Sequence, residues 1–271
     1  MQEHCSRLCA IISDMAARAA SIRARVRAEM SAEIKAVARR HLETDGANLS
    51  LRAVARDMGM VSSALYRYFA NRDELLTALI LDAYNALGDA VEAADAAVAD
   101  RSQLRARWLA ATRAVRSWAL AKPAEYALIY GSPVPGYAAP EDTIAAAART
   151  PAVLARILSD GFAAGSLKQT VQQTTAELKP ARPRIAVQPD DGAPASLRLE
   201  IHEPVRADLA QAREGIAPDL PEELMLLGMT SWIQMFGIVS FELFGQFNNV
   251  IEARAEFFDQ QMELMADLMG L

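Results

Sequence analysis

Residues 49–75, LSLRAVARDMGMVSSALYRYFANRDEL, predict two short helices joined by a glycine turn. Ser50 is placed to cap the first helix, and Leu49 and Val54 can close over its start as a hydrophobic staple. Gly59 favours a sharp turn, because glycine adopts the left-handed backbone conformation without steric cost. A helix, a tight turn and a second helix form the unit that places its second helix in the major groove of DNA.

The second helix of this unit is expected over residues 61–69, with one buried and one exposed face. Leu65 and Phe69 are four residues apart and are expected to pack inward. The outward face carries Ser62, Ser63, Tyr66 and Arg67. Asn71, followed three residues later by Glu74, forms a capping-box pattern. This pattern predicts a third, longer helix that starts at Arg72 and continues to about residue 99.

The end of the helix-turn-helix carries a longer string of residues in a fixed order. The string consists of Leu65, Tyr66, Arg67, Tyr68, Phe69, Asn71, Arg72, Glu74, Leu75 and Leu76. With it, residues 26–81 resemble the DNA-binding domain of the TetR family of bacterial transcription regulators. Two positions depart from the family pattern: Val61 stands where a capping Ser is usual, and Arg72 where Lys is usual. We expect Ser62 to take over the cap and to shorten the helix.

The resemblance implies DNA-contacting roles for residues of this segment. Base edges in the major groove would be approached by Ser62, Ser63, Ala64 and Arg67. Backbone phosphates would be held by Arg52, Tyr66, Tyr68 and Arg72. The alternative interpretation is that these are the ordinary solvated side chains of an exposed helix face.

The charge of the chain is divided along the sequence in a way that favours DNA binding at one end. Residues 1–72 carry a net charge of +5, whereas the remaining 199 residues carry −11. A basic N-terminal part supplies the electrostatic attraction that binding to phosphates requires. The acidic overall balance therefore does not argue against a DNA-binding protein.

The length of the chain allows two helical domains or one large one, and the resemblance implies an all-α fold. The chain has 271 residues, of which 52% are hydrophobic, and this is ample for a buried core. We expect an N-terminal extension at residues 1–22, a three-helix helix-turn-helix DNA-binding domain at 23–81, and a ligand-binding and dimerisation domain at 82–271. The first helix of the DNA-binding domain is predicted over residues 24–44.

Within the N-terminal extension, the stretch before Met15 is expected to be loose and to have no site of its own. Cys5 and Cys9 are the only cysteines, which excludes a disulfide framework and favours a reducing cytoplasm. With His4 they lack a fourth ligand, so we expect no metal and no cofactor. Asp14 interrupts the short apolar run, unlike a signal peptide. The arginines that follow can reach DNA as a flexible arm or belong to a solvated terminus: Arg23, Arg25 and Arg27.

Residues 123–137, PAEYALIYGSPVPGY, resemble the start of the ligand-binding half in a TetR subgroup with a Trp-His-Gly signature. The second part of that signature falls at residues 232–237, where Phe236 replaces the usual His. This replacement makes a pocket more apolar. Methionine-rich surfaces adapt to varied ligands, which favours a small apolar or amphipathic inducer. The candidate pocket residues are Trp108, Trp118, Tyr126, Tyr130, Met229, Trp232 and Phe236. The alternative for each is an ordinary core position.

Residues 224–251 form the most hydrophobic stretch, with Glu242 as its only charge. A membrane-spanning helix is not expected, because polar residues interrupt the run and no basic flank gives it an orientation. A helix that is apolar on all sides can instead lie between its own core and a second subunit. The resemblance implies a homodimer that pairs through a four-helix bundle built from about residues 221–269.

The segment at residues 180–221 contains seven of the twelve prolines and cannot be one continuous helix. Alternating apolar and polar residues within 184–202 are consistent with a small β-hairpin, and the alternative is a linker.

The function implied by the resemblance is that of a ligand-responsive transcriptional regulator. It would act as a repressor that binds palindromic double-stranded DNA as a homodimer and is released by an inducer. The alternative is a helical protein-interaction module whose DNA-binding head has lost its function, for which Val61 is the only indication. An enzyme is not expected, because the three histidines are scattered and no nucleophile, base and orienting group share a pattern.

Overall fold

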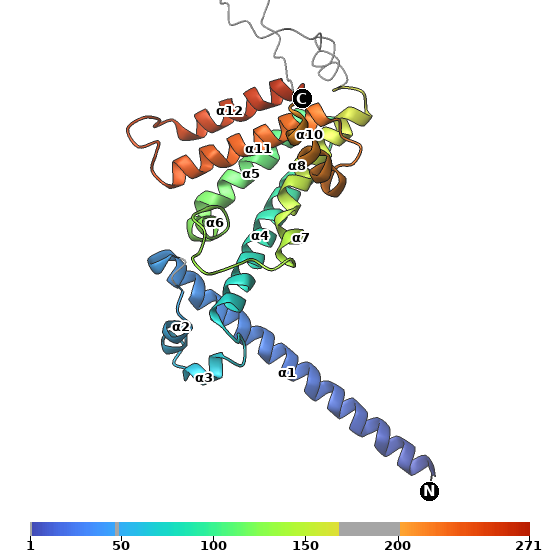
Figure 1. Cartoon of the computed structure of the whole chain (residues 1–271). Helices are drawn as coiled ribbons and strands as arrows, with labels where there is room; N and C mark the ends of the chain where they lie inside the picture. The colour runs from blue at the N-terminus through green and yellow to red at the C-terminus, as the bar shows by residue number, and fades with distance from the viewer. Residues whose placement is uncertain (1, 47–48, 168–200) are drawn as a thin grey trace, which may run out of the picture. The chain divides into compact units, whose positions relative to one another are not determined.

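The computed structural model describes residues 2–46, 49–167 and 201–271, and every regular element in these ranges is a helix (Figure 1). The all-α fold class is therefore confirmed. The helices are α1 (Gln2–Asp45), α2 (Leu51–Asp57), α3 (Ser62–Leu65), α4 (Arg72–Ala97), α5 (Leu104–Ala121), α6 (Pro123–Tyr130), α7 (Thr143–Ala147), α8 (Arg149–Ala163), α10 (Glu203–Ile216), α11 (Glu222–Leu243) and α12 (Arg254–Met269).

The helices belong to two compact units. Unit 1 comprises Met1–Ala83 and Pro123–Thr143, and unit 2 comprises Tyr84–Lys122 and Ile144–Leu271. Helix α4 begins in unit 1 and ends in unit 2. Residues 123–143, which the sequence reading placed with the second domain, pack on the core of unit 1, and the Thr77 and Tyr137 hydroxyls lie 2.9 Å apart there.

The core of unit 1 is built from apolar residues at helical spacing. Ile34, Ala38 and Leu42 line one face of α1 and pack with residues of α2, α3 and α4. Each fully buried Leu, Ile or Val side chain of this kind contributes roughly 1.5–3 kcal/mol. The cap of α2 is confirmed, because the Ser50 hydroxyl accepts a hydrogen bond from the Ala53 amide at 3.4 Å. Leu49 is buried in the same cluster, as a hydrophobic staple requires.

Helix α1 is longer than the sequence reading expected. It begins at Gln2 rather than near Ala24, so the prediction of a loose stretch before Met15 was wrong. Residues 2–23 contain no Gly or Pro and are rich in Ala, Arg and other helix-forming residues, so nothing in them stops the helix.

Helix α3 is shorter than predicted, and its cap differs from the expectation. The helix covers Ser62–Leu65 and is followed by a turn instead of continuing to Phe69. Val61 holds the N-cap position with an extended backbone and makes no capping bond. The prediction that Ser62 provides the cap was therefore wrong, because Ser62 is already the first helical residue.

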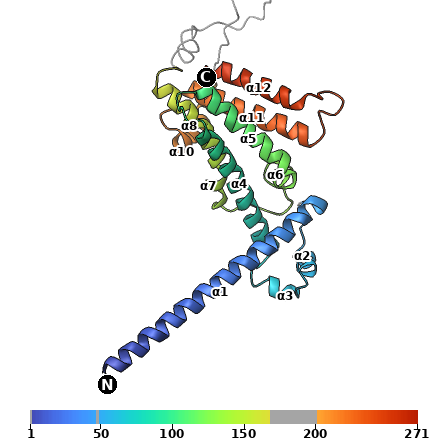
Figure 2. The ribbon, with the colours of Figure 1, turned by 180° about the vertical axis from the view of Figure 1, so that it is seen from behind.

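Unit 2 packs α5 against α8, α11 and α12, as the view from behind also shows (Figure 2). Trp108 of α5 is fully buried, and its indole Nε1 donates to the Met262 carbonyl at 3.1 Å. Glu242, the only charged residue in the last three turns of α11, forms a two-bond ion pair with Arg116 of α5 at 2.8 and 2.6 Å. The charge that interrupts the apolar stretch is thus neutralised by the neighbouring helix.

A buried charge cluster joins the end of α4 to α5 and α8. Asp95 is 1% exposed and accepts from Arg107 Nε at 2.8 Å, Arg101 Nη2 at 2.6 Å and Arg156 Nη2 at 3.1 Å. Arg107 is itself fully buried and also donates to Asp160 at 2.8 Å. Because charges are rarely buried unless they are paired, this cluster fixes how the three helices pack.

Helix α11 ends before the apolar stretch of residues 224–251 does. Helix α11 ends at Leu243, and a loop in which Gly245 and Asn249 adopt positive φ of 81° and 62° leads into α12. Among the described helices α11 alone has the length and hydropathy of a membrane span, with 44% of its most apolar window buried. Core helices of soluble proteins also meet this test, so it is weak evidence for a membrane.

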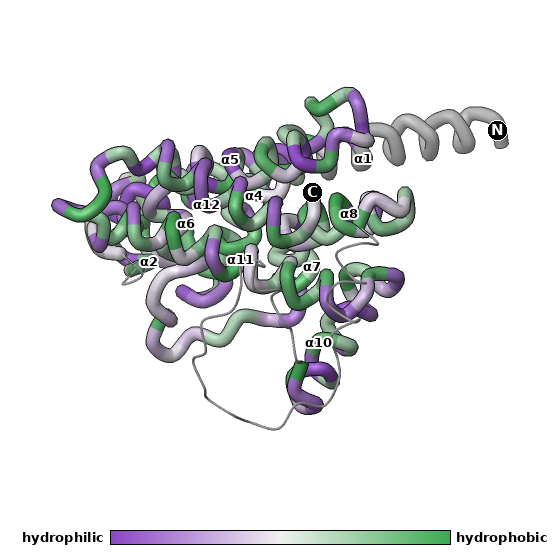
Figure 3. The backbone as a smooth tube through the Cα atoms, turned by 90° about the horizontal axis from the view of Figure 1, so that it is seen from above, coloured by the Kyte–Doolittle hydropathy of each residue, from purple (hydrophilic) through white to green (hydrophobic). Residues whose placement is uncertain are grey.

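The proline-rich segment at residues 180–221 contains a helix that was not predicted. Helix α10 begins with Pro204 in its first turn, where a missing amide hydrogen does no harm, and Pro218 follows its end. Helix α10 contains both hydrophilic and hydrophobic residues, as the colouring by hydropathy shows (Figure 3). Residues 184–200 of the predicted hairpin lie outside the residues that the structure describes. Its last two residues, 201 and 202, are described and are not in a strand.

Candidate DNA-binding surface and ligand pocket

The turn between α2 and α3 has the geometry that the sequence predicted. Gly59 adopts a φ of 66°, and the Met60 amide donates to the Ala55 carbonyl at 2.9 Å to close the end of α2. A side chain at position 59 would meet no atom within 4 Å, so the demand for glycine comes from the backbone conformation alone.

Helix α3 turns its apolar side inward and its polar side to solvent. Leu65 is fully buried and Phe69 is nearly so, whereas Ser63, Tyr66 and Arg67 are exposed. Two other candidate base-contacting residues, Ser62 and Ala64, are half-buried. Helix α3 and the turn that follows it therefore expose the Ser63 hydroxyl, the Tyr66 phenol and the Arg67 guanidinium, and the buried Leu65 and Phe69 anchor the segment.

The four candidate phosphate-binding residues have different surroundings. Arg52 of α2 and Tyr66 are exposed, whereas Tyr68 is half-buried with the Arg27 guanidinium 5.5 Å from the centre of its ring. Arg72 already donates through Nε to the Leu49 carbonyl at 3.2 Å. Part of the Arg72 side chain thus ties the start of α4 to the start of α2.

The start of α4 is capped as the sequence predicted. The Asn71 side chain accepts from the Glu74 amide at 2.8 Å, and the Glu74 carboxylate accepts from the Ala70 amide at 2.8 Å. Further along α4, Asp82 forms ion pairs with Lys35 of α1 at 2.7 Å and with Arg39 of α1. These pairs hold α4 to the longest helix of unit 1.

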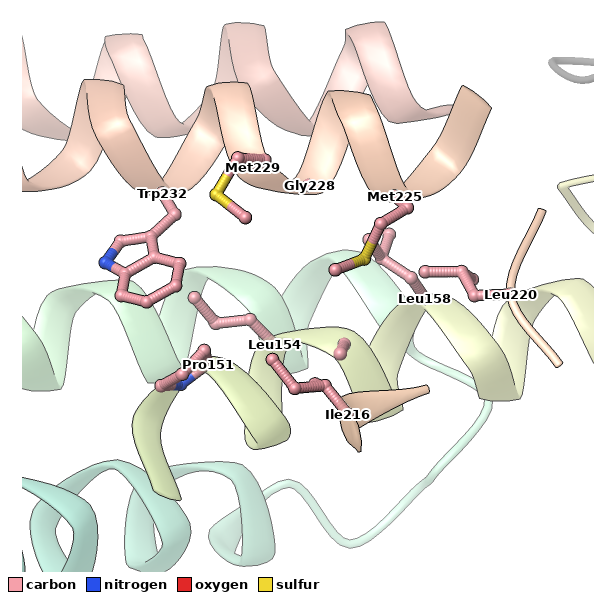
Figure 4. Close-up of a pocket in the computed structure, with 10 residues that line it drawn as sticks. Pro151, Leu154, Leu158, Ile216, Leu220, Met225, Gly228, Met229 and Trp232 are labelled. Atoms are coloured by element: carbon pink, nitrogen blue, oxygen red, sulfur yellow. The ribbon is translucent and has the colours of Figure 1, made fainter. Parts of the chain in front are cut away.

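Unit 2 contains a small apolar cavity of about 30 Å³ between α8, α11 and the end of α10 (Figure 4). Side chains from α8 and α11 face each other across it, and Ile216 and Leu220 close a third side. Its lining consists of Pro151, Leu154, Ala155, Leu158, Ile216, Leu220, Met225, Gly228, Met229 and Trp232. No charged side chain lines it, so it can accept only an apolar group.

Two of the seven candidate pocket residues, Met229 and Trp232, line this cavity. Phe236 is buried one turn further along α11, with its ring centre 6.0 Å from that of Trp232. Trp108 lies in the core, and Trp118 is not part of the lining.

The two candidate tyrosines belong to unit 1 rather than to the unit that contains the cavity. Tyr126 and Tyr130 lie on α6, with ring centres 5.3 Å apart. The sequence reading missed the whole contribution of α8, because its apolar residues form an ordinary helical pattern without a local signal of a cavity.

Arg149, at the start of α8, holds this helix to α4 through several interactions. Its Nε and Nη2 donate to the Glu92 carboxylate at 2.9 Å each, and Nη1 donates to the carbonyl and side chain of Asn85 at 3.0 Å each. Nη2 also pairs with Asp89 at 2.5 Å. A Cβ at Gly88 would lie 2.9 Å from Arg149 Nε, so the guanidinium has room there only because position 88 has no side chain.

Helices α11 and α12 leave an apolar face uncovered within unit 2. Along α11, Ile233, Phe241 and Phe244 are exposed, and a Cβ at Gly237 would have open space around it. On α12, Leu264 is also exposed. Among the described residues, no group of three or more His, Cys, Asp or Glu side chains is placed to hold a metal ion.

Comparisons with known proteins agree with this architecture. A family model described as "Bacterial regulatory proteins, tetR family" matches residues 34–79, and one described as "Tetracyclin repressor-like, C-terminal domain" matches residues 108–265. The HTH-type transcriptional regulators Rv1816 of Mycobacterium tuberculosis and Mb1846 of Mycobacterium bovis are each 36% identical over 254 residues, covering 90% of this chain and 94% of the relative.

Solved structures show the same fold. The regulatory protein SCO4313 is 33% identical, with a TM-score of 0.66 over 91% of this chain and 98% of the other. A Rhodococcus sp. RHA1 protein of unknown function is 22% identical, with a TM-score of 0.56 over 89% and 93% of the two chains, and shows the fold alone. The chain therefore belongs to the TetR family of transcriptional regulators and carries the helix-turn-helix DNA-binding domain of that family.

Proposed function

We propose that this protein is a homodimeric repressor that binds palindromic operator DNA in the cytoplasm and is released by a small apolar or amphipathic ligand. The observation that carries DNA binding is the exposed polar side of α3 and the turn after it, opposite the buried Leu65 and Phe69. Members of this family are transcriptional regulators, a class that is generally not enzymatic. The basic charge of residues 1–72 adds the attraction to phosphates.

The residues proposed to contact DNA lie on the helix-turn-helix and at its end, and only some of them are exposed. Ser63 and Arg67 are the best placed to meet base edges, because both are exposed. We assign base contacts to Ser62, Ser63, Ala64 and Arg67. We assign phosphate contacts to Arg52, Tyr66, Tyr68 and Arg72.

Replacing Arg67 with Ala is expected to weaken operator binding by roughly 5- to 150-fold, because a bidentate arginine–guanine contact contributes about 1–3 kcal/mol. The measurement is a gel shift with footprinting on the upstream DNA of the gene. Arg113→Ala is the control, since Arg113 is an exposed arginine of unit 2 that pairs with Asp259. Equal affinities of the two variants would reject the role of Arg67. Absence of salt-dependent DNA binding by the unchanged protein would favour the protein-interaction module.

The proposed homodimer rests on the uncovered face of α11 and α12. Ile233, Phe241 and Leu264 would be exposed apolar residues in a monomer, and burying them against a second copy removes this cost. Gly237 lies on the same face of α11 and allows another helix to approach closely. Two such helix pairs form a four-helix bundle, the arrangement predicted for residues 221–269.

The proposed ligand site is the apolar cavity, which must widen to accept a ligand. An engineered apolar cavity of about 150 Å³ binds benzene, whereas this one measures about 30 Å³. The wall formed by Ile216 and Leu220 is the part that can move most easily. Ile216 is the last residue of α10, and this helix is weakly anchored because Leu209 is its only buried residue. A ligand is therefore expected to push α8, α10 and α11 apart.

The path by which a ligand would affect DNA binding runs along α4. Arg149 lies two residues before Pro151 of the cavity wall, so a shift of α8 acts directly on its bonds to Asn85, Asp89 and Glu92. Asp82, one turn earlier on α4, is paired with α1 of unit 1. The same helix is thus held by charged groups from the cavity side and from the DNA-binding side.

Straight-chain alcohols from hexanol to dodecanol are expected to release the protein from DNA at a chain length that fits the widened cavity. Gly228→Leu should abolish this release by filling the cavity, because even a Cβ at position 228 would lie 3.0 Å from Leu158. Arg149→Gln should still bind the alcohol but lose the release. Alcohol binding is measured by thermal shift and release by fluorescence anisotropy. If the same alcohol concentration still releases the Gly228→Leu variant from DNA, the ligand does not bind in this cavity.

A further inference from the structure

The inward face of α1 continues past the core of unit 1 as a row of arginines. Ile34 and Ala38 are fully buried on this face. Arg27 precedes Ile34 by seven residues and Arg23 precedes it by eleven, so both lie close to the same helical row. Both arginines are exposed. Where the row leaves the core, guanidinium groups replace apolar side chains, which indicates an anionic partner rather than another packed helix.

The position of Arg27 relates this row to the helix-turn-helix. The Arg27 guanidinium carbon lies 5.5 Å from the centre of the Tyr68 ring, in a cation–π contact. Tyr68 follows α3 by three residues, next to the exposed Tyr66 and Arg67. The arginine row therefore begins beside the segment proposed to read DNA.

The third arginine of this stretch behaves differently. Arg25 is turned about 200° around the helix from Arg23 and Arg27, at 100° per residue. It forms an ion pair with Glu29 at 3.6 Å on the outer face of α1. Within the described part of the chain, no such carboxylate pairs with Arg23 or Arg27. The chain thus offers a natural control of the same residue type, two residues away.

We propose that Arg23 and Arg27 form a second DNA-binding site, which holds backbone phosphates beside the half-site occupied by α3. Guanidinium groups bind phosphate through two parallel hydrogen bonds, which suits arginine better than lysine. One turn of α1 separates the two arginines by about 6 Å along the helix, comparable with the rise of two nucleotides along the DNA axis, about 3.4 Å each. The site rests on the proposed DNA-binding function and lengthens the contact made by each subunit.

The site predicts a change in the salt dependence of DNA binding. Each phosphate contact contributes roughly 0.9 to the slope of log K against log salt concentration. The affinity of the full chain for a 40-base-pair duplex of random sequence is measured by fluorescence anisotropy between about 50 and 300 mM KCl. Because both subunits of the proposed dimer lose the contact, Arg23→Ala should reduce the slope by about 1.8, and Arg23→Ala with Arg27→Ala by about 3.6. Footprints on specific DNA should shorten on both outer edges.

Controls separate this site from a general effect of charge and from a folding defect. Arg25→Ala removes the same charge from the outer face and should leave the slope unchanged. Arg23→Ala leaves the Arg27–Tyr68 contact in place, and circular dichroism should show unchanged helix content. Arg27→Lys keeps the positive charge, so most of the slope of log K against log salt concentration should remain.

Two failures can be told apart. In the first, the unchanged protein binds DNA with a steep salt dependence, but Arg23→Ala and the double variant have the same slope as Arg25→Ala. The second site is then overturned and the proposed function stands. An acidic protein partner becomes the better occupant of the arginine row. If the unchanged protein shows no salt-dependent binding to DNA, the proposed function fails and this site fails with it.

Discussion

Replacing Asp95 with Ala is expected to lower the free energy of unfolding by about 3–5 kcal/mol, the largest effect of any single substitution considered. The reason is that the change leaves Arg107 with a fully buried guanidinium and only Asp160 to balance it. Even in the intact cluster the Arg107 Nη2 atom is buried without a hydrogen-bond partner, so the cluster has no spare acceptor to compensate. Loss of one buried partner is costlier than loss of the whole pair.

The measurement is urea unfolding of the intact protein followed by circular dichroism. Asp259→Ala is the matched control, because it also removes a carboxylate paired with an arginine but one that is 43% exposed. That control should change the free energy of unfolding by at most about 1 kcal/mol. Asp95→Leu combined with Arg107→Met should recover much of the loss. If Asp95→Ala is no more harmful than the control, the cluster does not stabilise unit 2.

The effect of Asp95 is also expected to depend on pH. Burial raises the pKa of Asp95, but its hydrogen bonds to Arg107, Arg101 and Arg156 outweigh burial and hold the pKa below its usual value. A carboxylate with a lowered pKa in the folded state contributes stability that is fully present above its unfolded pKa of about 3.9 and is lost as the pH falls through the folded value. The difference between the unchanged protein and Asp95→Ala should therefore be constant near neutral pH and shrink below about pH 4.

The parts of the fold that could be predicted from sequence are those fixed by residues a few positions apart. Ser50 caps α2, Gly59 makes the turn, and Asn71 with Glu74 caps α4, as their local patterns indicated. Such signals are reliable because the bonds they form stay within one turn. The string at residues 65–76, which resembles the TetR family, predicted in addition that this domain binds DNA.

Features that depend on residues far apart in sequence could not be predicted. The contacts of Arg149 with α4 span about sixty positions, and nothing near either partner signals them. The cavity arises where Leu154 and Leu158 of α8 face α11, which is a property of packing rather than of pattern. Trp108 looked like a pocket residue because of its size, but the structure uses it to fill the core.

The ends of two helices differ from prediction because residues that often stop a helix are absent in one case and compatible with it in the other. Helix α1 continues to Gln2 since no residue before Ala24 breaks it. Helix α10 forms in a proline-rich segment because Pro204 occupies the first turn, where proline is compatible with a helix.

Replacing Ile233 with Glu is expected to convert the proposed homodimer into monomers. Ile233 is 68% exposed in the single chain and stands on the outward face of α11, near Gly237. In a four-helix bundle this position would be buried against the second copy, where an unpaired carboxylate costs several kcal/mol. The dimer dissociation constant should rise by at least about 100-fold, since 1.4 kcal/mol corresponds to a factor of ten. The fold of the single chain should be unchanged, because no buried contact is lost.

Analytical ultracentrifugation measures the dimer, and anisotropy measures its effect on DNA. Monomers lose the second half-site contact, so operator affinity should fall by about 10²- to 10⁴-fold while α3 itself is untouched. Ile144→Glu is the control, because Ile144 is an isoleucine of unit 2 with a similar exposure of 64% but lies on α7, away from α11 and α12. A dimer that survives Ile233→Glu as well as it survives Ile144→Glu would mean that subunits pair through another surface. Weakened DNA binding without dissociation would instead point to an effect of α11 on the DNA-binding unit, which the Arg149→Gln variant can then test.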